Sequence, residues 1–140
     1  MSFGWSVGDL IQAISIGIKA VEALNGTRGA PAGYQDISRF FCNVQKTLEP
    51  LQNENAAAVY SSNRVEIETL VMAINGPLRA ILSQIQNYDA KLGSQVDSKW
   101  YKHAPQKLLW EFWGSPKAKA SRAIVEGHLQ TLMLLLQRLT

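Results

Sequence analysis

The chain has 140 residues, a formal net charge of +3, a single cysteine and 46% hydrophobic residues. A chain of this length is expected to form one domain that buries about two-thirds of the surface of its unfolded form, so it needs no disulfide or metal for stability. One cysteine excludes an internal disulfide and suits a reducing compartment, and no segment approaches the roughly 18 uncharged apolar residues of a membrane span.

The first residues predict neither a secretory signal nor a lipid anchor. A signal peptide begins with a basic region, whereas this chain has none and carries Asp9 early. N-myristoylation requires glycine directly after Met1, and Ser2 stands there instead.

A first helix is predicted over about residues 7–24. Ser6 followed by Asp9 resembles a capping box, and Asn25-Gly26 is expected to end the helix. Polar side chains lie off a face whose apolar residues recur at helical spacing: Val7, Leu10, Ile11, Ile14, Ile18 and Val21.

Two interpretations of this amphipathic helix remain open. It is either an ordinary core helix or a core helix that can also leave the bundle and enter a membrane. The second interpretation makes the following residues the candidate membrane helix: Phe3, Trp5, Val7, Leu10, Ile11, Ile14 and Ile18.

The second predicted helix follows a glycine- and proline-containing loop over residues 25–33. It starts near Tyr34, its apolar residues alternate in steps of three and four, and Pro50 is expected to kink or end it. Residues 54–63 are expected to connect it to the next helix, with some helix through the three alanines.

A long apolar pattern from Ile67 to Leu92 predicts the third helix. Gly76-Pro77 interrupts the pattern, so we expect either a kink near Ile74 or two separate helices. Residues 93–99 form a polar loop, and a short helix is expected over about residues 105–113.

The last helix is predicted to begin at Ser115-Pro116, with serine as the cap and proline in the first position. Its inward face is expected to contain Ser121, Ile124, Val125, His128, Leu129, Leu132, Leu135, Leu136 and Leu139. No alternation of period two predicts a strand. The expected fold is therefore all-α: one domain over residues 1–140, a bundle of four long helices plus a short connecting helix.

Positive charge is concentrated in the last third of the chain. Residues 1–98 contain seven Lys or Arg against nine Asp or Glu, and residues 99–140 contain seven against two. Tryptophans beside lysines suit a phospholipid headgroup region. The candidate lipid-binding residues are Lys99, Trp100, Lys102, Lys107, Trp110, Trp113, Lys117, Lys119 and Arg122. The alternative is a solvated lysine face with the tryptophans packed under the end of the bundle.

Other chemistry finds little support in the sequence. His103 and His128 lack a second ligand at helical spacing, so no metal site is expected. Glu66 and Glu68 point to different sides of a helix, and Cys42 is expected to be a small buried hydrophobe. No nucleic-acid-binding motif accompanies the basic residues. We therefore expect no enzyme activity, cofactor, small-molecule substrate or nucleic-acid partner.

The opening Met-Ser-Phe-Gly-Trp-Ser-Val-Gly-Asp-Leu, the Ala30-Pro31 loop and Tyr34-Gln35-Asp36-Ile37-Ser38 resemble the fungal N-terminal domain of STAND proteins, the HeLo-like family. The resemblance continues at residues 107–110 and 128–136 and so covers nearly the whole chain. It implies an all-α bundle that heads a larger NOD-like receptor and acts in non-self recognition and regulated cell death. In related HeLo domains and necroptotic four-helix bundles, the N-terminal helix is thought to attack the membrane.

Three functional hypotheses follow. In the first, the domain is an effector that downstream modules oligomerise and that moves from the cytoplasm to anionic membrane lipids. In the second, it is an adaptor bundle that works only through protein contacts. A small helical hydrolase subunit is the third.

Overall fold

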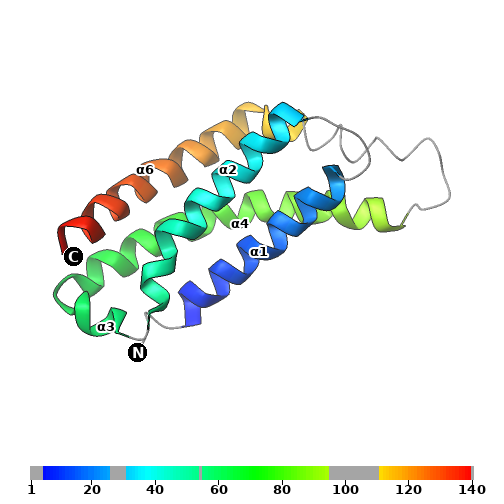
Figure 1. The fold of residues 1–140 in the computed structure, drawn as a ribbon. Helices are drawn as coiled ribbons and strands as arrows, with labels where there is room; N and C mark the ends of the chain where they lie inside the picture. Colours follow the sequence, from blue (N-terminus) through cyan, green and yellow to red (C-terminus); the bar gives the residue numbers. More distant parts are fainter. Residues whose placement is uncertain (1–4, 26–30, 54, 95–110, 140) are drawn as a thin grey trace.

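The computed structural model describes residues 5–25, 31–53, 55–94 and 111–139 (Figure 1). Within these ranges the chain is helical and contains no strand, so the all-α prediction is confirmed. The long helices are α1 (Trp5–Asn25), α2 (Pro31–Leu48), α4 (Arg64–Ser94) and α6 (Pro116–Leu139). Between α2 and α4 lie three short elements: η1 (Glu49–Gln52), α3 (Ala56–Val59) and η2 (Ser61–Asn63).

The longest helix, α4, organises the bundle. It packs against both α1 and α6, and α1 also packs against α2. Figure 1 shows α6 running back along α4, so that its end lies near the start of α4. Helices α2 and α6 approach each other much less closely along their length. The bundle is therefore tight around α4 and looser between α2 and α6.

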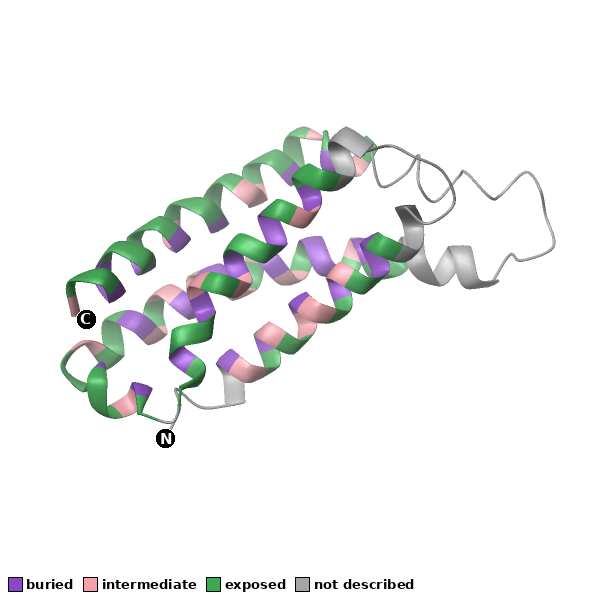
Figure 2. Ribbon diagram, in the orientation of Figure 1, coloured by how far each residue is buried: buried purple, intermediate pink, exposed green. Residues whose placement is uncertain are grey.

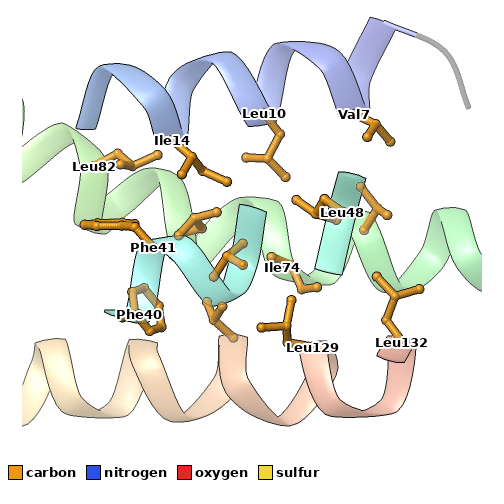
Figure 3. Close-up of a cluster of buried hydrophobic side chains, with 14 of the residues drawn as sticks. Val7, Leu10, Ile14, Phe40, Phe41, Leu48, Ile74, Leu82, Leu129 and Leu132 are labelled. Carbon is orange, nitrogen blue, oxygen red and sulfur yellow. The ribbon is translucent and has the colours of Figure 1, made fainter. Parts of the chain in front are cut away.

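Each long helix turns an apolar stripe toward a common core (Figure 2). Leu10 and Ile14 of α1 point toward Phe41, Ile74 and the other core residues drawn in Figure 3, and neither is exposed to solvent. Such side chains each contribute about 1.5–3 kcal/mol when fully buried. The hydrophobic spacing read from the sequence thus predicts the inward faces of α1, α2 and α4.

Several helix ends agree with the sequence. The backbone N–H of Ala118 donates to Ser115 Oγ at 3.2 Å, which is the expected cap of α6. Helix α2 ends at Leu48, and Pro50 lies in the following turn η1. Of the expected short helix over residues 105–113, only residues 111–113 are described, and they are helical.

One of the two alternatives for the third helix fails, and two expected helix starts are wrong. Helix α4 is continuous through Gly76-Pro77, so the alternative of two separate helices fails. Proline costs one backbone hydrogen bond there, but Ile74, Leu78 and the rest of the buried stripe hold both halves on the same core. Helix α2 begins at Pro31, not near Tyr34, because proline is well suited to the first turn. Helix α1 begins at Trp5, before the expected start at Val7, and the side chain of Ser6 lies outside the described residues.

The exposure of three residues also differs from expectation. The sequence predicts an inward position for Ile124, which is 51% exposed, and a buried position for Cys42, which is exposed. His128 is half-buried at the edge of the core. Helical spacing alone does not fix how far around the helix the neighbouring helices reach.

Candidate functional site

Helix α1 is held in the bundle mainly by its apolar face. Of the candidate membrane-helix residues, Val7, Leu10 and Ile14 are buried in the core. Ile11 and Ile18 are partly buried and pack against the same cluster. Trp5 is the first residue of α1, but its side chain and all of Phe3 lie outside the described residues.

Two polar contacts from other helices fasten α1 on its outer sides. Arg79 of α4 forms an ion pair with Asp9 and also donates from Nε to Asn75 Oδ1 at 2.7 Å. Gln45 of α2 donates from Nε2 to Ser15 Oγ at 2.9 Å. The ion pair is about half exposed, so it contributes only about 0–1 kcal/mol. The apolar face therefore dominates the attachment of α1.

Helices α1 and α4 are in tight contact at Gly17. A β-carbon placed on Gly17 would lie 2.3 Å from Leu82 Cδ2, which is too close for any real atom pair. Glycine therefore lets the side chain of Leu82 fill the space against the backbone of α1. This contact could not be predicted from the sequence, because the glycine looks like an ordinary interruption of the apolar pattern.

Trp113 and Arg122 form a closed cluster with α2. The indole ring of Trp113 is buried beside Phe40 and Phe41, with ring centroids 5.6 and 6.3 Å away. Its Nε1–H donates to Asp36 Oδ2 at 2.8 Å. These contacts place Trp113 in the interior of the bundle end, as in the packed-tryptophan alternative.

The guanidinium of Arg122 covers the same ring. It lies 4.1 Å from the ring centroid, donates to the carbonyl oxygen of Trp113 at 2.7 Å and pairs with Asp36 at 3.4 Å. A guanidinium held in this way joins α6 to α2, and its side chain is only 16% exposed, which limits its access to a lipid phosphate. The sequence did not reveal the partnership, because Asp36 and Arg122 are far apart along the chain.

Among the described basic candidates, Lys117 and Lys119 are fully available to solvent. Both are exposed and lie in the first turn of α6. Positive charge is unfavourable at a helix N-terminus, so these lysines are not there to stabilise α6. The other candidates lie outside the described residues: Lys99, Trp100, Lys102, Lys107 and Trp110.

A groove follows the loose contact between α2 and α6. Its two hollows have volumes of about 480 and 350 Å³ and share Lys46, Thr47 and Met133 in their walls. Phe40 and Leu129 line the larger hollow. Sequence reasoning did not predict this groove, because it depends on how far the two helices diverge.

The described residues contain no cluster of three or more His, Cys, Asp or Glu side chains that would bind a metal ion. Glu68 pairs with Arg64, whereas Glu66 accepts a hydrogen bond from Asn63, so the two carboxylates have separate partners. In the part of the chain that the structure covers, every helix is too short or too polar to cross a membrane.

Comparison of the chain with protein-family models, curated proteins and solved structures finds no match.

Proposed function

We propose that the chain is the N-terminal effector domain of a fungal NOD-like (STAND) receptor, a HeLo-like bundle that acts at membranes through α1. In this proposal downstream modules of the receptor assemble the domain upon non-self recognition. The assembled bundles then move from the cytoplasm to anionic lipid and trigger regulated cell death, as in heterokaryon incompatibility. The resemblance of the opening residues and of residues 34–38 to the HeLo-like family supports the receptor context.

The way α1 is attached carries the membrane part of the proposal. Val7, Leu10, Ile14 and Val21 are buried, so exposing them to water would cost about 6–12 kcal/mol at about 1.5–3 kcal/mol each. This cost is comparable with the 5–15 kcal/mol total stability of a typical domain. Release of α1 into water is therefore prohibitive, whereas release into lipid returns most of the cost, because the same face is again removed from water.

Polar contacts contribute little to holding α1 in the bundle. The Asp9–Arg79 pair is exposed, and the Ser15–Gln45 hydrogen bond is a single neutral contact. A neutral hydrogen bond contributes about 0.5–1.5 kcal/mol. The proposed release of α1 therefore depends on whether its apolar face is more favourably buried in the bundle or in lipid.

A reversible covalent lock tests whether α1 must leave the bundle. A β-carbon on Gly17 would lie 3.7 Å from Leu82 Cγ, so the pair Gly17→Cys and Leu82→Cys brings two thiols within reach of a disulfide. The second substitution also removes the methyl groups that Gly17 accommodates. The exposed native thiol is removed by Cys42→Ser.

Binding to vesicles of phosphatidylserine and phosphatidylcholine is then measured for the oxidised and reduced forms of the same variant. We expect the reduced form to sediment with the vesicles and release an entrapped dye, and the oxidised form to do neither. Equal activity of the two forms would show that α1 stays in the bundle. Binding by neither form nor by the wild type would remove the membrane role.

The alternative function is an adaptor bundle without membrane activity. The apolar groove between α2 and α6 favours it, because grooves of this kind accept amphipathic helices. The burial of Trp113 and the contacts of Arg122 with Trp113 and Asp36 favour it too, because they take both residues from the candidate lipid surface. An adaptor would ignore vesicles in the experiment above, and its locked and reduced forms would bind a protein partner equally.

A further inference from the structure

A stripe of uncharged residues runs along the outward side of α4 from Val65 to Ala80. Val65, Thr69, Met72, Gly76 and Ala80 recur every three or four residues and are all exposed. Two of them are large and apolar: Val65 is 78% exposed and Met72 is 76% exposed. This stripe has the composition of a helix face that is covered, although nothing in the bundle covers it.

A matching stripe runs along α6. Ala120, Ile124, Gly127, Thr131 and Leu134 recur at the same spacing and are exposed. Because α4 and α6 pack together, the two stripes form one surface, which we call the neutral face. Near its end a hollow of about 540 Å³ is lined by residues of both helices, among them Thr131 and Leu134 of α6 and Glu66 of α4.

The charged side chains of these stretches point elsewhere. Between Thr69 and Ser83 the only charged residue is Arg79, which pairs with Asp9 of α1. Between Ala120 and Leu134 they are Arg122, which pairs with Asp36 of α2, and Glu126, which lines the groove toward α2. Over residues 69–83 of α4 and 120–134 of α6 the neutral face is thus uncharged, because the charges of these stretches are directed to α1 or α2, whereas Glu66 and Arg138 line the hollow at its end.

Two glycines on the neutral face border open space within a single copy. A β-carbon on Gly76 or on Gly127 would meet no atom within 4 Å. Gly76 precedes Pro77 inside α4, where the proline ring disfavours a β-carbon on the preceding helical residue. Gly127 has no such neighbour, and glycine inside a helix is less stable than alanine, so its use is explained if the backbone of another molecule comes close to α6 at this point.

We infer that the neutral face binds a second copy of this chain, with α6 packed against α6 in antiparallel orientation about a two-fold axis near Gly127. A two-fold interface must be complementary to itself, and an uncharged face meets its own copy without like-charge repulsion. Ile124 and Thr131 lie on opposite sides of Gly127 along the helix. The two-fold axis therefore places Ile124 of each copy beside the hollow at Thr131 and Leu134 of the other.

The size of the neutral face sets the strength of the pair. At 1.5 Å per residue it is about 25 Å long, and two packed helices make it about 20 Å wide, so a pair buries about 1,000 Å² in total. Stable complexes bury about 1,200–2,000 Å². The pair is therefore weak and reversible when the domain is free, and becomes populated when several copies are tethered together. The inference does not depend on the membrane role of α1.

Sedimentation equilibrium of the 140-residue chain without lipid tests the interface. We expect a reversible monomer–dimer equilibrium, weakened at least tenfold by Gly127→Glu and by Ile124→Glu. The matched control is Asn43→Glu, which adds the same charge on the wall of the groove between α2 and α6 and leaves dimerisation unchanged. Circular dichroism checks that each variant is folded. Gly127→Glu is expected to fold, because it replaces a glycine in the interior of a helix by a better helix former.

A cross-link provides a second measurement that does not depend on affinity. In a Cys42→Ser background, Gly127→Cys lies close to the two-fold axis and is expected to oxidise to a covalent dimer, whereas Asn43→Cys stays largely monomeric. A wild type that stays monomeric up to about 1 mM overturns the inference, as does a dimer that only Asn43→Glu disrupts. A monomer that binds vesicles through Ile124 would assign the face to lipid instead.

Discussion

At the scale of single residues, glycine has opposite meanings at two positions in long helices. At Gly17 the side chain of Leu82 occupies the space where a β-carbon would be, so any other residue there forces Leu82 to move. Gly127 faces open space, so a methyl group there meets nothing in the same molecule. Sequence alone does not distinguish the two glycines, since both interrupt an apolar helical pattern.

The two glycines are therefore predicted to respond in opposite directions to alanine. Gly17→Ala should lower the free energy of unfolding by about 1–3 kcal/mol, the usual cost of overpacking a core. Gly127→Ala should raise it by about 0.5–1 kcal/mol, because alanine is the better helix former. Urea unfolding followed by circular dichroism measures both, with dilute protein so that only the monomer contributes. The same sign for both variants would contradict the packing described here.

At the scale of the elements, α1 combines a strongly buried face with an outer side that contains an unexpected hydrophobe. Ile16 is 48% exposed and lies among polar residues of α1. It offers a matched control for the buried positions on the same helix. The attachment of α1 then becomes measurable residue by residue.

Leu10→Ala and Ile14→Ala are each expected to lower the free energy of unfolding by about 2–5 kcal/mol, because both side chains are fully buried and each change leaves a cavity. Ile16→Ala should change it by less than about 0.5 kcal/mol, as is usual for a surface position. Chemical denaturation of the three variants gives the comparison. A small loss at Leu10 and Ile14 would mean that α1 is only loosely docked.

At the scale of the whole molecule, charge is distributed by the fold in a way that the linear count does not show. Arg122 and Arg79 are bound internally to carboxylates of α2 and α1, whereas Lys117 and Lys119 remain exposed at the start of α6. The positive charge available to a membrane is thus smaller than the count over residues 99–140 indicates.

Neutralising Lys99, Lys102, Lys117 and Lys119 together is expected to weaken binding to phosphatidylserine vesicles by up to about 4 kcal/mol, at about 1 kcal/mol per lysine near the surface. Added salt should weaken the wild type in the same way, because surface charges are screened over about 8–10 Å. Co-sedimentation measures both effects, with neutral vesicles as the control. Equal binding by wild type and quadruple variant would exclude these lysines as the lipid contact.

The sequence by itself determined the helices and their inward faces. The spacing of apolar residues and the helix-ending residues suffice for this prediction, because apolar spacing and a cap such as Ser115 act within a single helix. The tertiary structure alone decided which positions at the margin of each face are covered, since that depends on the distance to the next helix. It buried Trp113, exposed Ile124 and Cys42, and paired Asp9 with Arg79 across a long stretch of chain.

The same division applies to the candidate sites. The membrane helix could be read from the sequence because amphipathicity is a property of one segment. The groove between α2 and α6 and the neutral face of α4 and α6 could not, because each is made by two helices whose relative placement follows from core packing. The sequence does not show the partners of Arg79 and Arg122, and only the packed bundle directs these side chains to carboxylates of α1 and α2 and away from the neutral face.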